Sequence, residues 1–289
     1  MHGSQWQNIK LAHGDFSRRY LIHVPHTLTK MAHPLVLVLH GAGSKSEDAA
    51  THYGWVQKSE KESFIVAFPQ AMPLDPSRPA NFKTNPNNWN DGHERREKKI
   101  DDISFLRKVV EDISAHHLID NNRIYMTGFS NGASMTLRAG IELSDIIAAI
   151  AAISGHLWIK NPHPIRPMSM LLIAGGMDPF KPLKGGFERN PWLIKEEVIP
   201  PMKSSIEKWV KLIGIDESNK ILKSKNGIDV ISYGPNKNDL IAVFIVLAEQ
   251  GHEWPGGQRV LPETISGKNI QTFKATDVIW NFFKTQMLT

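Results

Sequence analysis

The sequence predicts an α/β fold with a mostly parallel central sheet and helices on both faces. Strand-like apolar runs alternate with helix-like stretches along the 289 residues, an order typical of parallel sheets. The runs at 35–39 and 64–68 are apolar throughout, as strands buried on both faces require. A third strand, at 123–127, leads through a short glycine-flanked turn into a helix-like stretch, so strand, turn and helix follow one another directly.

The expected elements alternate in this way from end to end. The turn at 13–15 joins the first two strands, and Pro69 stops the strand before it. Over 102–116 the apolar residues recur at the spacing of one helix face. The full set is strands at 5–11, 18–24, 35–39, 64–68, 123–127, 148–153, 170–174 and 241–248, and helices at 46–62, 102–116, 133–139, 204–213 and 272–286.

No linker or change of composition divides the chain, so a single domain over residues 1–289 is expected. Three loop insertions interrupt it, near 70–99, 156–168 and 179–201. The first is rich in proline, asparagine and charge and is too long for a plain connection. It is therefore expected to be a functional loop over the site.

The turn after the strand at 123–127 reads Gly128-Phe-Ser130-Asn-Gly132. A Gly-x-Ser-x-Gly string between a strand and a helix is the nucleophile elbow of an α/β-hydrolase fold. Glycines are needed there because a Cβ at either position would collide with the neighbouring strand or helix. The string alone is a weak signal, and its position between a strand and a helix strengthens it.

An acid and a histidine should follow the serine in that order, each after a later strand. Asp178 follows the strand at 170–174, and His252 follows the strand at 241–248. Ser130 is then the expected nucleophile, His252 its base and Asp178 the group that orients the imidazole.

Other acids and histidines fit this order less well. Asp145 and Asp216 do not follow convincing strands, and His156 follows a strand but precedes Asp178.

The strand at 35–39 ends in His40-Gly-Ala-Gly43, which resembles the loop that supplies one oxyanion donor in lipases and esterases. The backbone N–H groups of Asn131 and of Ala42 or Gly41 are expected to form the oxyanion hole.

Composition bears on the other classes of function. The net charge is +5 with no cysteine and a pI near 9.2, so disulfides and thiolate-bound metals are excluded. The densest basic cluster, at 95–99, is diluted by acidic neighbours, and no nucleic-acid-binding signature occurs. No apolar run is long enough for a membrane span, and no metal-ligand or phosphate-loop motif is found.

Several blocks together resemble the polyhydroxybutyrate depolymerase / feruloyl esterase family of α/β-hydrolases. They lie at 39–43, 89–92, 101–105, 123–132 and 251–256, the last reading Gly-His-Glu-Trp-Pro-Gly. The resemblance implies a secreted or periplasmic serine esterase without metal or organic cofactor, any leader being absent from this chain. Its triad carries over to Ser130, Asp178 and His252. Asn88 stands where many secreted members have a cysteine.

The leading expectation is a carboxylic ester hydrolase that forms an acyl-enzyme with a feruloyl, acetyl or short hydroxyacyl ester. The substrate is expected to be a small molecule or an oligomer. Trp89, Trp254 and His40 are candidates for substrate binding, with core packing as the alternative for the two tryptophans and shaping of the oxyanion turn for His40. A peptidase of the prolyl oligopeptidase type, or a catalytically silent binding protein with the same fold, remains open, as does the oligomeric state.

Overall fold

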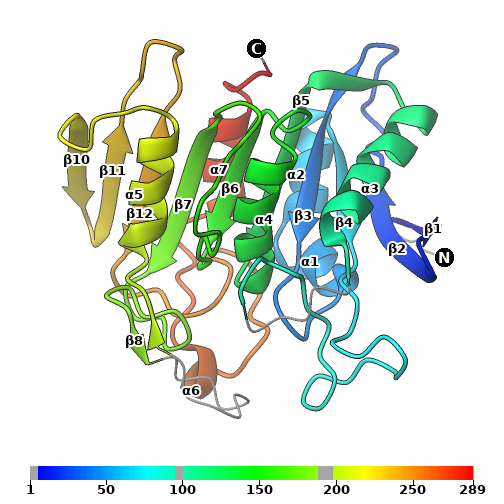
Figure 1. Ribbon diagram of the computed structural model, residues 1–289, viewed down its shortest axis with the longest axis horizontal. Helices are drawn as coiled ribbons and strands as arrows, with labels where there is room; N and C mark the ends of the chain where they lie inside the picture. Colours follow the sequence, from blue (N-terminus) through cyan, green and yellow to red (C-terminus); the bar gives the residue numbers. More distant parts are fainter. Residues whose placement is uncertain (1–5, 95–99, 188–197, 289) are drawn as a thin grey trace.

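The computed structural model describes residues 6–94, 100–187 and 198–288. The basic cluster at 95–99 and the middle of the insertion at 179–201 lie outside these ranges. Ten strands form one sheet, with the order β1-β2-β4-β3-β5-β6-β7-β12-β11-β10 (Figure 1). They are β1 (Gln7–His13), β2 (Phe16–His23), β3 (His33–Leu39), β4 (Ile65–Pro69), β5 (Ile119–Phe129), β6 (Ala149–Ile153), β7 (Ser169–Gly175), β10 (Lys220–Lys225), β11 (Ile228–Tyr233) and β12 (Ala242–Leu247).

The six central strands, from β4 to β12 in the sheet order, pair in parallel. Antiparallel pairs extend the sheet at both edges: β2 joins β4 and carries β1, and β11 joins β12 and carries β10. The predicted α/β-hydrolase fold with a mostly parallel sheet is therefore confirmed. Parallel strands bring their carboxyl ends to one edge, where ligands bind in open α/β sheets.

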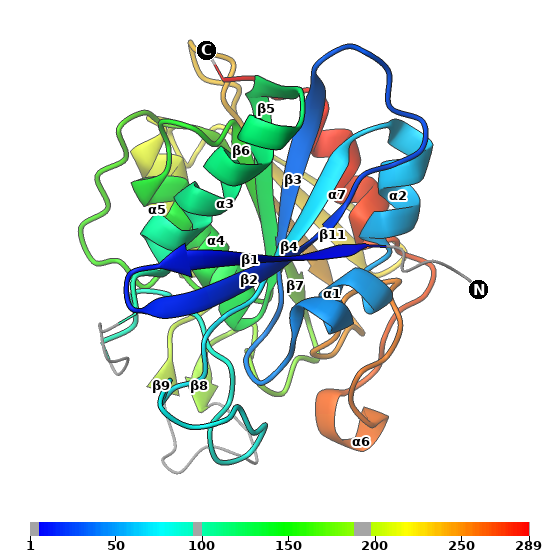
Figure 2. The same ribbon diagram turned by 90° about the vertical axis from the view of Figure 1, so that its right-hand side faces the viewer.

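Helices cover both faces of the sheet (Figures 1 and 2). The longer helices α3, α4 and α5 pack on one face, and α1, α2 and α7 pack on the other. The helices are α1 (Ser46–His52), α2 (Trp55–Glu62), α3 (Asp102–His116), α4 (Asn131–Glu142), α5 (Lys203–Leu212), α6 (Glu263–Ser266) and α7 (Ala275–Phe283).

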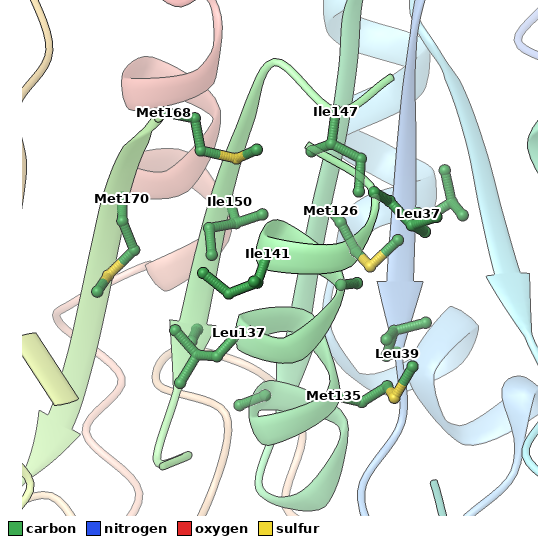
Figure 3. Packing of buried hydrophobic residues seen from close by; sticks show 14 of the residues in the cluster. Leu37, Leu39, Met126, Met135, Leu137, Ile141, Ile147, Ile150, Met168 and Met170 are labelled. Carbon is green, nitrogen blue, oxygen red and sulfur yellow. The ribbon is translucent and has the colours of Figure 1, made fainter. Parts of the chain in front are cut away.

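Helix α4 lies over the centre of the sheet (Figure 3). Its residues Met135, Leu137 and Ile141 pack in the same buried cluster as Met126 of β5 and Ile150 of β6. Burying a large apolar side chain contributes roughly 1.5–3 kcal/mol, so this packing holds α4 against the sheet. The first turn of α4 carries the residues that follow Ser130.

Two local predictions were incomplete. The single helix expected over 46–62 is divided into α1 and α2, because Gly54 adopts a left-handed φ of 77° between them. The hairpin of β10 and β11 was missed, although Asn226-Gly227 is a strong hairpin-turn signal. Both turn residues have positive φ.

The first and third expected insertions follow the carboxyl ends of β4 and β7, whereas the second runs from the end of β6 back to the amino end of β7. The first has irregular structure over 70–94 apart from isolated bridges. The third contains the small hairpin of β8 (Gly186–Phe187) and β9 (Val198–Ile199).

Candidate active site

Ser130 lies at a strained turn between β5 and α4. Its φ of 56° and ψ of −119° belong to a region that residues with a side chain rarely adopt. The backbone N–H of Ser130 donates to the carbonyl of Ile153 at 2.9 Å. The turn is thereby fixed to the end of β6, with the serine side chain partly accessible.

The two flanking glycines are required for steric reasons. A Cβ on Gly128 would lie 2.4 Å from the carbonyl oxygen of Gly132. A Cβ on Gly132 would lie 2.4 Å from the carbonyl oxygen of His40. The elbow is therefore packed between the end of β3 and the first turn of α4, as the spacing of the glycines predicts.

The structure brings the three expected triad residues together, each from the loop after a different parallel strand. His252 Nε2 lies 2.9 Å from Ser130 Oγ, and His252 Nδ1 lies 2.7 Å from Asp178 Oδ2. The imidazole and the carboxylate are both buried. This is the geometry in which a histidine can take a proton from a serine while a carboxylate fixes its tautomer.

The carboxylate of Asp178 is held in its charged form. Burial, the largest single effect, raises its pKa, but the charge and hydrogen bond of His252 and the hydrogen bonds from Lys181 and Ser154 together lower it further, and the net pKa is below the ordinary value. Asp178 Oδ1 also accepts from the N–H groups of Phe180 at 2.9 Å and Lys181 at 2.8 Å. The Ser154 side chain contributes a further hydrogen bond.

The loop after β3 passes close to Ser130. A Cβ on Gly41 would lie 3.5 Å from Ser130 Cβ. The Gly41 N–H is occupied, because the Tyr53 hydroxyl accepts a hydrogen bond from it. Among the described residues, the N–H groups of Ala42 and Asn131 have no acceptor. Of the two alternatives for the second oxyanion donor, Ala42 is the one whose N–H makes no contact with the Tyr53 hydroxyl.

His40 supports this loop from inside. Its side chain is fully buried; Nε2 accepts from the N–H of Ala71 at 3.1 Å, so Nδ1 carries the proton and donates to the carbonyl of Gly41 at 2.8 Å. Burial lowers the pKa of His40 to about 4. A neutral, inaccessible imidazole shapes the turn and is not available to a substrate.

The two tryptophans proposed for substrate binding are also core residues. Trp89 is 0% exposed and Trp254 is 1% exposed. Trp254 stacks on Tyr53 with 4.3 Å between ring centroids, and its indole N–H donates to Thr276 Oγ1 at 3.0 Å. With almost no accessible surface, neither side chain lines a substrate pocket in this structure, so the core-packing alternative describes both.

Four residues near the triad were not anticipated. The rings of Phe129 and Phe180 lie 4.7 Å and 4.8 Å from that of His252, centroid to centroid. Tyr53 and Ser154 contribute the hydrogen bonds described above. Ser154 was detectable, since it directly follows a predicted strand, whereas nothing local marks Tyr53, which is brought to the site by the packing of α1.

His156, the rival histidine, does not join the triad. It is fully buried, and neither ring nitrogen has a hydrogen-bond partner among the described residues. Burial, assisted by the charge of Lys181 and opposed by that of Asp178, lowers its pKa to about 3. It packs beside the ring of Trp158 at 5.1 Å.

Two further features of the described ranges concern metals and membranes. They contain no group of three or more histidine, aspartate or glutamate side chains placed to hold a metal ion. None of their helices is both long and apolar enough to cross a bilayer.

Comparison with known proteins places this site in a family. Residues 26–208, more than half of the chain, match the phospholipase/carboxylesterase family. The chain therefore belongs to this family of esterases in the α/β-hydrolase superfamily, and the resemblance read from the motifs is confirmed.

Individual relatives carry esterase names. NocK of Nocardia uniformis subsp. tsuyamanensis, which bears an esterase name, is 24% identical over 86% of this chain and 73% of its own length. Feruloyl esterase B of Piromyces equi is 31% identical over 39% of this chain, a match that spans 22% of the relative. An acetyl xylan esterase from Aspergillus awamori superposes with a TM-score of 0.61 at 13% identity, covering 96% of this chain and 99% of the other. The last similarity shows the fold alone.

Proposed function

We propose that this protein is a serine carboxylic ester hydrolase that works through an acyl-enzyme. The observation that carries the proposal is the position of His252, whose two ring nitrogens lie within hydrogen-bond distance of Ser130 and Asp178. A serine hydroxyl is a weak nucleophile until a base in such a position removes its proton.

In the first half of the reaction, Ser130 Oγ attacks the ester carbonyl carbon and His252 Nε2 takes the serine proton. The oxyanion of the tetrahedral intermediate is held by the N–H groups of Ala42 and Asn131. When the carbon–oxygen bond to the alcohol breaks, His252 returns the proton to the leaving alkoxide. The ionised Asp178 stabilises the imidazolium throughout.

In the second half, water attacks the acyl-enzyme and His252 accepts a proton from that water. Collapse of the intermediate releases the carboxylic acid and restores Ser130 with its proton. The family resemblance favours a feruloyl, acetyl or short hydroxyacyl ester, of a small molecule or an oligomer, as the substrate.

The test is ester hydrolysis by the wild type and by Ser130→Ala, using p-nitrophenyl acetate, butyrate and octanoate, methyl ferulate and a 3-hydroxybutyrate oligomer. We expect Ser130→Ala to lose all turnover. The ester that the wild type prefers should distinguish feruloyl, acetyl and hydroxyacyl substrates. A fluorophosphonate should label the wild type at Ser130. Folded wild-type protein that cleaves no ester and is not labelled would overturn the proposal; labelling without esterase activity would point to a peptidase.

A further inference from the structure

We infer that the segment 87–91 is a positioning element for both donors of the oxyanion hole, with Trp89 at its centre. The inference rests on the proposed function, because it assigns a task within that site. The segment belongs to the insertion at 70–99. It contacts Asn131, which follows the nucleophile, and the loop after β3 that contains Ala42.

On one side the segment holds the residue that follows Ser130. The backbone N–H of Trp89 donates to Asn131 Oδ1 at 2.7 Å, and Asn131 Nδ2 donates back to the carbonyl of Trp89 at 3.1 Å. Asn131 Nδ2 also donates to Asp91 Oδ2 at 2.8 Å. The Asn131 side chain is 5% exposed, so it is tied to the segment and directs none of its polar atoms to solvent. This fixes the start of α4, where the first oxyanion donor lies.

On the other side the segment holds the loop that contains Ala42. The indole N–H of Trp89 donates to the carbonyl of His40 at 2.9 Å. The carbonyl of Asn87 accepts from the N–H of Gly43 at 2.8 Å, and Asn87 Nδ2 donates to the carbonyl of Ser44 at 2.9 Å. Ala42 thus lies between two anchored positions, so its N–H can turn little.

The segment is itself anchored to the body of the fold. The N–H of Asn90 donates to Asp102 Oδ2 at 2.7 Å, and Arg138 donates to the carbonyl of Asn90 at 2.6 Å. Asp102 is the first residue of α3 and Arg138 lies on α4. The backbone polar groups of Trp89 and Asn90 are therefore all engaged, and two helices fix the segment against the sheet.

Preorganised donors stabilise an oxyanion because they need not reorient when its charge develops. A tie that sets donor direction should therefore affect the transition state more than substrate binding, which appears as a lower kcat with little change in KM. A residue that merely fills the core would lower stability and leave the kcat of each folded molecule unchanged.

The chain offers a matched control for Trp89. Trp209, on α5, is 2% exposed, and its indole N–H donates to the carbonyl of Met168 at 2.9 Å. Met168 immediately precedes β7, so this bond lies at the amino end of the strand, opposite the site. Replacing either tryptophan by phenylalanine removes one indole N–H from one buried carbonyl.

The experiment compares Trp89→Phe and Trp209→Phe by thermal unfolding and by steady-state kinetics on the best ester, with active sites counted by fluorophosphonate titration. Trp89→Phe should lower kcat per titrated site by about 10-fold or more. The loss should be smaller than the roughly 10²–10³-fold cost of losing a whole oxyanion donor. KM should change less than about twofold, and Trp209→Phe should keep kcat within about twofold.

Asn87→Ala provides a second variant if Trp89→Phe does not fold, because it cuts only the side-chain tie to Ser44. It should also lower kcat with little change in KM. Equal kcat values per titrated site for wild type, Trp209→Phe and the tested variant would overturn the inference. If Ser130→Ala is inactive at the same time, the proposed function stands; an active Ser130→Ala would overturn the function instead.

Discussion

His252 and Asp178 meet through a hydrogen bond of 2.7 Å between Nδ1 and Oδ2, where both side chains are almost closed to water. The carboxylate has four hydrogen-bond donors: His252, two backbone N–H groups and Ser154. They compensate the cost of burying the charge, and the pKa of Asp178 falls below its ordinary value. Asp178 is therefore expected to contribute both to catalysis and to the stability of the fold, and its replacement can test each contribution.

Asp178→Asn should lower kcat by about 10⁴-fold, because an amide can donate to Nδ1 and leave the imidazole in the wrong tautomer. Steady-state kinetics with circular dichroism measures this. A folded variant with kcat within tenfold of the wild type would contradict the assignment of Asp178.

The same variant tests stability against pH. A carboxyl whose pKa is depressed by folding stabilises the protein above its unfolded pKa, about 3.9, and that stability is lost as the pH falls through the folded value. The wild type should therefore exceed Asp178→Asn in free energy of unfolding at pH 7, and the difference should shrink below about pH 4. A difference that is constant from pH 7 to pH 3 would refute the pKa shift.

Gly132→Ala should destabilise the protein by at least the roughly 1–3 kcal/mol typical of overpacking. The new Cβ would lie 2.4 Å from one backbone oxygen and 2.6 Å from another, and neither can move aside cheaply. Gly214→Ala is the control: its φ of 71° is strained for alanine, but no atom lies within 4 Å of the added Cβ. Denaturant unfolding should rank Gly132→Ala as the less stable.

Asp102→Asn should cost about 3–5 kcal/mol, because it leaves the buried guanidinium of Arg18 without its counter-charge. Their ion pair of 2.7 Å has side chains that are 1% and 0% exposed. Asp145→Asn breaks the Arg107 pair, whose side chains are 34% and 32% exposed, and should cost less than about 1 kcal/mol. Similar losses in free energy of unfolding for both variants would argue against a special role for burial.

His156→Leu should flatten the dependence of stability on pH. The pKa of His156 is about 3 in the folded chain and about 6.5 in the unfolded chain. As the pH falls below about 6.5, the unfolded state therefore takes up a proton that the folded state does not, and the free energy of unfolding decreases. Between pH 7 and pH 5 this amounts to about 1–2 kcal/mol. His116→Leu, at a side chain that is 70% exposed, should leave the wild-type slope; an unchanged slope in His156→Leu would disprove the prediction.

The parallel sheet and the order of the three triad candidates were predictable because they depend on local patterns. Fully apolar runs specify strands buried on both faces, and strand-end positions specify which side chains reach the common edge. The glycines around Ser130 also act over a few residues. The division of the helix at Gly54 and the turn at 226–227 were local signals as well, and were overlooked.

The sequence alone determined the class of fold, the family and the candidates Ser130, Asp178 and His252, because periodicity, motif order and close glycine contacts leave direct traces in the chain. Only the tertiary structure decided that Trp89, Trp254 and His40 are buried supports, that Tyr53 occupies the Gly41 N–H, and that segment 87–91 ties Asn131 to the loop of Ala42. These contacts join residues that are at least about 10 positions apart in the sequence. Side-chain burial and hydrogen-bond partners at that separation depend on how whole elements pack, which no local pattern encodes.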